Sequence, residues 1–144
     1  MNKIAIGCDH AGFEYKESLK NFLKEKGIEI IDKGTYGPDS VDYPDFVHPV
    51  AKTVASKDVD SGILICGSGN GVAMTANKYP EVRAGICWSK EIAELIRLHN
   101  NANVLCIPAR FVSQHMMFDI AQTFVETSFE GGRHKRRVDK ICAC

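Results

Sequence analysis

The sequence has no long apolar run, no cysteine pair of the C-x-x-C type and no excess of either charge. No stretch of about 18 apolar residues occurs, and Met1-Asn2-Lys3 leads directly into a short strand-like run rather than into the apolar region of a signal peptide. We therefore expect a cytoplasmic protein without a membrane partner. The 18 basic and 18 acidic residues cancel, so the whole molecule has no general attraction for nucleic acid or acidic membranes.

The six cysteines do not form a disulfide or zinc framework in the sequence. Four of them lie in or just after apolar, strand-like runs, where a free thiol packs as a small apolar side chain: Cys8, Cys66, Cys87 and Cys106. Cys142 and Cys144 offer two ligands for a soft metal, but no third ligand lies near them in the sequence. The sequence predicts reduced thiols and no metal site.

Short apolar runs alternate with segments of helical periodicity along the chain. Five runs predict strands: Lys3 to Cys8, Ile28 to Asp32, Gly62 to Cys66, Ala84 to Cys87 and Asn103 to Ile107. The chain has 144 residues, 44% of them hydrophobic, and no change of composition marks a linker, so we expect a single domain over residues 1–144. The alternation predicts an α/β, doubly wound, Rossmann-like fold with a five-stranded parallel sheet in the order 2-1-3-4-5.

One helix is hard to delimit from the sequence. Val47, Val50, Ala51 and Val54 lie at helical spacing, but Pro49 falls among them. Proline lacks the N–H that a helix interior needs and fits best in the first turn. The sequence therefore predicts that this helix begins later than its apolar pattern suggests.

The segment Cys66-Gly67-Ser68-Gly69-Asn70-Gly71 has the strongest functional signal. It follows the apolar run from Gly62 to Ile65. Glycines let successive N–H groups converge on a negative oxygen, so the loop places a thiol beside an anion cradle. The alternative is a tight strand-to-helix turn after a buried structural cysteine. Val72 stands where a dinucleotide fingerprint needs glycine, and the Gly-Lys-Ser/Thr of a Walker loop is absent, so neither standard nucleotide motif is present.

Other polar candidates also follow predicted strands. Asp9 and His10 come after the first strand, the glycine loop after the third and Arg110 after the fifth. Ligands of doubly wound folds bind beyond the carboxyl ends of the strands, at the switch point between the first and third. The agreement favours a site over a plain turn, although Asp9 fits a helix N-cap equally well.

The C-terminal part is locally basic. Residues 133–140 contain five Lys or Arg against Asp139 alone, which fits a solvated helix face, a nucleic-acid patch or a phosphate clamp. Arg133 and Arg137 are four apart, so a helix over this segment places both on one face. His99, near the end of another predicted helix, has the alternative role of a partner for the helix dipole.

The motifs taken together resemble a known family. The glycine loop occurs with Gly7-Cys8-Asp9-His10-Ala11-Gly12, Asp42-Tyr43-Pro44, Ala76-Asn77-Lys78, His99-Asn100-Asn101-Ala102-Asn103 and Gly131-Gly132-Arg133-His134. In this order and spacing they closely resemble the type B ribose-5-phosphate isomerases over nearly the whole chain. Galactose-6-phosphate and allose-6-phosphate isomerases belong to the same superfamily.

The resemblance implies a cofactor-free aldose-ketose isomerisation through an enediolate. In one branch of the family the base is a cysteine at the position of Cys66, and in another it is a glutamate where this chain has Val72, so the chain is similar to the cysteine branch. Ser68 stands where relatives often carry threonine and keeps a hydroxyl. His99 is implied as the acid and base that opens the furanose ring, and Asp9 as a residue that binds hydroxyls or orients that group.

The resemblance also implies a substrate-binding set and an assembly. The implied substrate-binding residues are Asp9, His10, Tyr43, Gly67, Ser68, Gly69, Asn70, Gly71, Asn100, Arg110, Arg133, His134 and Arg137. Among these, His10, Arg110, Arg133 and Arg137 are implied to hold the phosphate, with the basic segment 131–144 contributing. In relatives the site joins two subunits, with His99, Asn100 and Arg110 facing the loop of the other chain, so we expect a homodimer or a tetramer.

Three alternatives remain open at this stage. The substrate can be allose 6-phosphate or galactose 6-phosphate, which differ from the pentose by one hydroxymethyl group. The fold can serve a non-catalytic module that binds a sugar phosphate or a nucleotide, but this leaves Cys66 without a role. An RNA-binding role for the basic tail lacks a motif and interleaved aromatic residues, so we expect no nucleic-acid partner.

Overall fold

Five parallel strands form one sheet in the computed structural model, which describes residues 1–142. The strands are β1 (Lys3–Cys8), β2 (Glu29–Asp32), β3 (Ser61–Cys66), β4 (Ala84–Ile86) and β5 (Val104–Pro108). Each lies within two residues of a predicted run, so the predicted strands are confirmed. The switch point is also where the sequence predicts it, because β1 pairs with both β2 and β3.

The strand order is β2-β1-β3-β5-β4, so the predicted order 2-1-3-4-5 is wrong in its last two members. Burial explains the difference. β5 has five fully buried residues and suits the interior of a sheet, whereas β4 has only three residues, all partly exposed, and suits an edge. The chain therefore passes over the place of β5, forms β4 at the edge and returns to pair β5 with β3.

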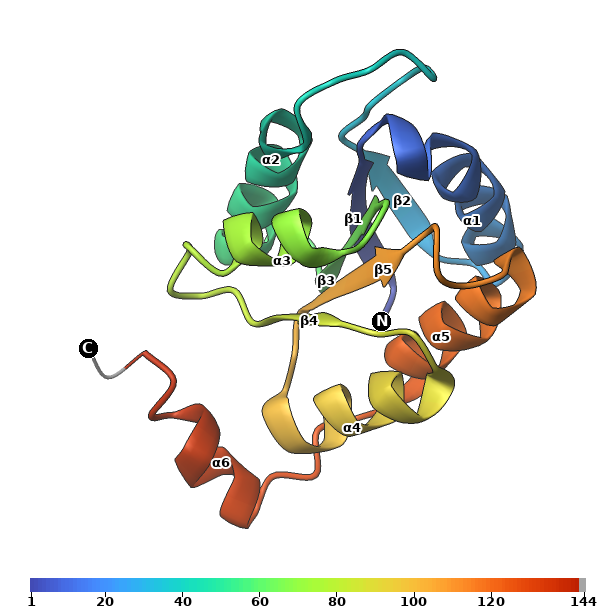
Figure 1. Cartoon of the computed structure of the whole chain (residues 1–144). Helices are drawn as coiled ribbons and strands as arrows, with labels where there is room; N and C mark the ends of the chain where they lie inside the picture. Colours follow the sequence, from blue (N-terminus) through green and yellow to red (C-terminus); the bar gives the residue numbers. More distant parts are fainter. Residues whose placement is uncertain (143–144) are drawn as a thin grey trace.

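Helices cover both faces of the sheet (Figure 1). The helices α1 (Phe13–Glu25), α4 (Lys90–Asn100) and α5 (Gln114–Glu126) cover one face, and α2 (Tyr43–Ala55) and α3 (Asn70–Ala76) cover the other. A short 3₁₀ turn, η1 (His10–Gly12), follows β1. The last helix, α6 (Arg133–Val138), stands apart from the sheet and contacts α4. None of the helices among residues 1–142 combines the length and the apolar character needed to cross a membrane.

The core is built by the alternation of side chains along the strands. In β3, Ile63 and Ile65 pack toward α1 and α5, whereas Leu64 and Cys66 pack toward α2 and α3. All four side chains are buried. Full burial of one such aliphatic side chain stabilises the fold by about 1.5–3 kcal/mol, and the two layers hold the carboxyl end of β3 between them. The Cys66 thiol therefore has a fixed position.

The predicted late start of α2 is wrong. The helix begins at Tyr43, with Pro44 in its first turn, and continues through Pro49. The interior proline forfeits the backbone bond that its N–H would have donated to the carbonyl of Asp45. The buried stripe that includes Val47 and Val50 outweighs this loss, because it covers β1 and β3.

Candidate functional site

The loop after β3 surrounds the sulfur of Cys66. The backbone N–H of Gly69 donates a hydrogen bond to Cys66 Sγ over 3.1 Å, and Cys66 is only 4% exposed. Gly69 has φ of 76°, a left-handed conformation in which glycine is the favoured residue. The N–H of Asn70 donates to Ser68 Oγ at 3.4 Å. Two of the loop amides that the sequence predicts to converge on an anion, those of Gly69 and Asn70, are therefore directed at the loop's own side chains.

The other buried thiols have an environment that keeps them neutral. Burial raises the pKa of Cys8 and of Cys87 to about 12. Complete burial, and then the neighbouring Cys66 and Cys87, raise the pKa of Cys106 well above its usual range. A neutral thiol is a poor base, so these three cysteines are structural.

Two further predicted residues lie against the same loop. Tyr43 packs on Gly71 so closely that a Cβ added to the glycine would lie 2.4 Å from the ring carbon Cζ. The guanidinium of Arg110 lies beside Gly67, where an added Cβ would be 3.2 Å from Nε. The backbone N–H of Arg110 donates to the Gly67 carbonyl. Arg110 thus lies on the loop of its own chain. Within one chain Arg110 therefore lies apart from His99 and Asn100, because it comes two residues after the end of β5, which pairs with β3.

Asp9 and His10 complete the group at this edge of the sheet. Asp9 is 8% exposed, caps η1 by accepting from the Gly12 N–H at 3.1 Å, and donates its own N–H to the carbonyl of Ile65. The capping role considered for Asp9 is therefore present, and the cap fixes the carboxylate next to the end of β3. His10 Nδ1 accepts the N–H of Val41 at 3.3 Å, which leaves Nε2 as the nitrogen that can donate to a ligand.

The remaining predicted residues lie elsewhere in the chain. His99 and Asn100 end α4, and α4 runs back from the end of β4 to the start of β5. A strand of five or six residues spans about 15 Å or more, so the end of α4 is roughly that far from the Cys66 loop. Arg133, His134 and Arg137 are in α6, which packs on α4. Within one chain the predicted residues thus form two groups, one at the carboxyl ends of the strands and the other toward their amino ends.

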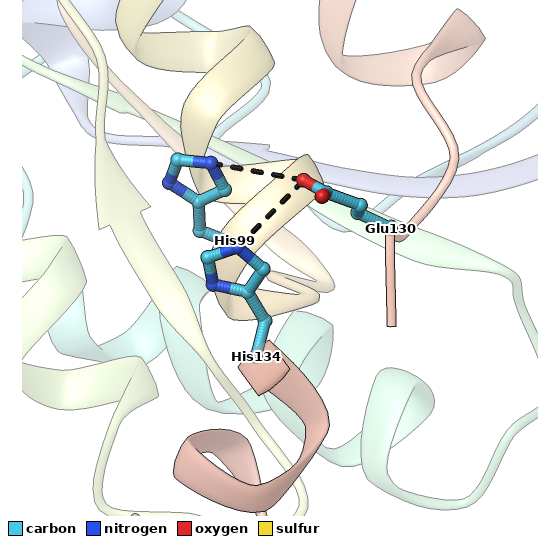
Figure 2. Close-up of side chains that lie close together, drawn as sticks. All are labelled: His99, Glu130 and His134. Atoms are coloured by element: carbon cyan, nitrogen blue, oxygen red, sulfur yellow. Dashed lines mark ion pairs between the residues drawn. The ribbon is translucent and has the colours of Figure 1, made fainter. Parts of the chain in front are cut away.

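A stacked pair of histidines organises the second group (Figure 2). The rings of His99 and His134 lie 4.2 Å apart at 7°. Glu130 Oε2 is 3.9 Å from His99 Nε2 and 3.7 Å from His134 Nε2. Burial, and then the adjacent His99, lower the pKa of His134. Glu130 was not identified from the sequence. A spacing of four places two residues on one side of a helix, but Gly131 and Gly132 lie between Glu130 and His134 and make a helix there unfavourable.

This cluster is the one group of residues among 1–142 with a composition suited to a metal ion, since its three ligand atoms lie within 4.8 Å of one another. The ring planes argue against a preformed metal site. The lone pair of an imidazole nitrogen lies in the ring plane, and two nearly parallel planes do not meet at one ion. Binding a metal would require one ring to leave the stack. Cys142 donates to the Pro80 carbonyl, and Cys144 lies outside the described residues.

The arginines of α6 are exposed. Arg133 and Arg137 fall on one side of the helix, as the spacing predicts, and Lys135 pairs with Asp139 at 2.7 Å. The exposed guanidinium groups are free to bind an anion brought from outside the chain.

Two hollows lie next to these groups. One of about 400 Å³ lies beside the Cys66 loop and is lined by Ser68, Asn70, Ile86, Trp88, Pro108 and Phe111. A larger one of about 630 Å³ lies at the opposite edge and includes Asn100, Ile96 and Cys142. Of the predicted site residues only Asn100 lines this larger hollow, whereas Ser68 and Asn70 line the smaller one. The smaller hollow is therefore the one relevant to chemistry at the loop.

Comparison with known proteins places the chain in a family. Residues 4–141 match the profile of the family described as Ribose/Galactose Isomerase. The chain is 44% identical to ribose-5-phosphate isomerase B of Escherichia coli K12, over 99% of this chain and 96% of that protein. Its fold matches the crystal structure of a ribose 5-phosphate isomerase from Thermotoga maritima with a TM-score of 0.97 and 48% identity, over 99% of both chains. It also matches ribose-5-phosphate isomerase B of Mycoplasma genitalium, solved with bound ribulose-5-phosphate, with a TM-score of 0.94 and 45% identity, over 98% of this chain and 94% of that one. The chain therefore belongs to the ribose/galactose isomerase family, and within it the resemblance to the type B ribose-5-phosphate isomerases is confirmed.

Proposed function

We propose that this protein interconverts D-ribose 5-phosphate and D-ribulose 5-phosphate, with Cys66 as the base and His99 as the group that opens the ring. The observation that carries the proposal is the buried Cys66 sulfur, held by the Gly69 amide, in a chain 44% identical to the Escherichia coli isomerase. The ribulose-5-phosphate bound to the Mycoplasma genitalium relative supports a pentose phosphate as substrate.

Ring opening comes first. The furanose loses the proton of its C1 hydroxyl, the bond between C1 and the ring oxygen breaks, and the ring oxygen takes up a proton. An imidazole is suited to both transfers because it gains and loses a proton near neutral pH. His99 gives one proton and takes one, so it ends in its initial state.

Isomerisation follows on the open chain. The Cys66 thiolate takes the proton from C2, and the electrons of that bond form the C1–C2 double bond of the enediolate. The proton of the C2 hydroxyl moves to O1, and the carbon proton returns to C1, which leaves a ketone at C2. Amides of residues 67–71 that are not directed at Cys66 or Ser68 stabilise the enediolate oxygen, and loss of one such donor costs about 3 kcal/mol.

Two copies of the chain supply one complete site in this proposal. His99 is about a strand length from Cys66 within one chain, so it cannot act on a sugar held by the same chain's loop. Among the elements of residues 1–142, α6 packs closely on α4 and stands away from the sheet. In this proposal its exposed side meets a second copy. The phosphate then lies among Arg110 and His10 of one copy and Arg133 and Arg137 of the other. A homodimer, alone or paired into a tetramer, is the smallest active unit.

The test is an assay of the purified protein on ribose 5-phosphate, allose 6-phosphate and galactose 6-phosphate side by side. We expect ribose 5-phosphate to have the highest kcat/KM, and we expect its rate of isomerisation to be unchanged after treatment with a chelator. A preference for either hexose phosphate would assign the chain to another branch of the family. Binding of ribose 5-phosphate without turnover would favour a non-catalytic module, and a rate restored only by zinc or manganese would overturn the cofactor-free reaction.

A further inference from the structure

Glu130 is a charged residue close to His99 that the proposed reaction leaves without a role. Its Oε2 lies 3.9 Å from His99 Nε2 and 3.7 Å from His134 Nε2, beyond hydrogen-bond distance but within ion-pair distance (Figure 2). Both ring nitrogens face the same oxygen. The carboxylate is therefore shared between the two histidines.

The backbone holds Glu130 at this place. The Glu130 N–H donates to the Leu98 carbonyl at 3.1 Å, and the side chain of Arg97 donates to the Thr127 carbonyl at 3.1 Å. These bonds lay the segment 127–130 along the last turn of α4. Gly131 and Gly132, both with positive φ, then turn the chain so that α6 brings His134 back over His99. The carboxylate and the second ring are thus built into the fold next to His99.

The surroundings make the two rings unequal. His134 is 5% exposed, and its Nε2 makes no hydrogen bond with any residue among 1–142, whereas the side chain of His99 is 39% exposed. Burial, and then the adjacent His99, lower the pKa of His134; Glu130 acts in the opposite direction, and Arg133 and Arg137 add to the lowering. The His99 ring is the one open to solvent, with the carboxylate facing it.

We propose that Glu130 is a positioning residue for His99: its carboxylate, fixed beside the last turn of α4, orients the exposed imidazole toward the substrate, and the ring of His134 stacks on it. This inference rests on the proposed ring-opening role of His99. The protonated ring gives its proton to the furanose oxygen as the bond from C1 breaks, and it recovers a proton from the C1 hydroxyl. A carboxylate beside the ring stabilises the imidazolium form from which the step begins.

The test compares Glu130→Gln, which keeps the shape and removes the charge, with Glu126→Gln, which removes an exposed carboxylate at the end of α5. The first readout is the titration of the His99 ring, followed by NMR with ¹⁵N-labelled histidine. We expect its midpoint to fall by about one pH unit in Glu130→Gln and to stay unchanged in Glu126→Gln. The second readout is kcat/KM against pH. The limb that requires protonated His99 should move to lower pH, and the rate with ribose 5-phosphate should fall roughly tenfold, more than the rate with ribulose 5-phosphate.

The two readouts separate the possible failures. An unchanged His99 titration in Glu130→Gln would overturn the inference, as would equal losses on both sugars without a change in the pH profile, because these indicate a structural role. A wild-type protein without isomerase activity would instead overturn the proposed function, and the NMR titration would still measure the coupling between Glu130 and His99. Glu130→Asp should give an intermediate midpoint, since it keeps the charge and shortens the reach.

Discussion

The N–H of Gly69 donates a hydrogen bond to the Sγ of Cys66 over 3.1 Å, three residues away across the turn that ends β3. A donor aimed at sulfur stabilises the negative thiolate more than the neutral thiol. The turn directs a backbone N–H at the thiol of Cys66, whereas burial raises the pKa of Cys8, Cys87 and Cys106.

Cys66→Ala should abolish isomerisation and the exchange of the substrate's C2 proton with solvent, because the group that takes this proton is removed. Loss of a general base lowers a rate by roughly a hundredfold to ten-thousandfold. Sugar-phosphate binding should remain, since the thiol acts on carbon. Exchange measured by NMR in deuterated water checks the prediction, with Cys106→Ala as the control that keeps most of its activity. Turnover near the wild-type level in Cys66→Ala would show that another group is the base.

Gly71→Ala should damage the site through Tyr43. The added Cβ would lie 2.4 Å from the Tyr43 ring, so either the ring or the start of α3 has to move. Overpacking of this kind costs about 1–3 kcal/mol. Thermal unfolding and kcat/KM measure the effect, and Gly37→Ala is the matched control because no atom lies within 4 Å of its added Cβ. Removing the ring with Tyr43→Ala should restore stability to the Gly71→Ala protein. No restoration would mean that the clash is not with Tyr43.

Arg137→Ala should weaken substrate binding much more than Arg136→Ala. The two arginines are exposed neighbours in α6, but about 100° of helix rotation separates them, and only Arg137 shares a side with Arg133. A charge-assisted contact contributes about 1.5–3 kcal/mol, so KM for ribose 5-phosphate should rise roughly tenfold to a hundredfold in Arg137→Ala. Steady-state kinetics at fixed ionic strength provide the comparison. Similar losses at both positions would indicate a diffuse basic patch and would favour a nucleic-acid partner.

Asp32→Asn should destabilise the fold strongly. The ammonium group of Lys16 is fully buried and lies 2.7 Å from Asp32 Oδ2 and 2.9 Å from Glu17 Oε1. The substitution removes one of these two carboxylates, and the loss of a hydrogen-bonded charged partner costs about 1.5–3 kcal/mol. Urea unfolding measures the loss. The exposed pair of Lys3 and Glu29 is the control, because Glu29→Gln should change stability by less than about 1 kcal/mol. Comparable losses in the two variants would contradict the assigned importance of the buried pair.

The same carboxylate predicts a pH dependence of stability. Burial alone would raise the pKa of Asp32, but hydrogen bonds from Lys16 and Lys20 outweigh it and hold the pKa below its usual range. The ion pair therefore contributes fully above the ordinary pKa of an aspartate, about 4, and its contribution is lost as the pH falls through the lowered value. The stability of the wild type should decline more steeply below about pH 4 than that of Asp32→Asn.

Much of the fold follows from local sequence patterns, and the errors have physical causes. The strands are confirmed to within two residues because β-rich apolar runs are local signals. The order of β4 and β5 depends on which of two runs is buried on both sides, and this is a property of the assembled sheet. The interior Pro49 violates a local preference that the packing of α2 on the sheet overrides.

The candidate site was predictable where it follows strand ends. Asp9 and Arg110 come just after strands and Cys66 ends one, and the parallel sheet brings the carboxyl ends of β1, β3 and β5 together. Glu130 follows no strand. Its place beside His99 depends on a backbone bond to Leu98 and on the turn at Gly131 and Gly132, so no local pattern indicates it.

The central claim is that the Cys66 loop of one copy works with His99 of another. Its most direct test mixes two inactive variants, Cys66→Ala and His99→Asn, by co-expression or by joint refolding. A mixed dimer has one site with both changes and one site with neither. Random pairing of equal amounts makes half of the dimers mixed, so about a quarter of the wild-type activity should return. If both groups acted within a single chain, every chain would lack one of them, and a mixture without recovered activity would contradict the account.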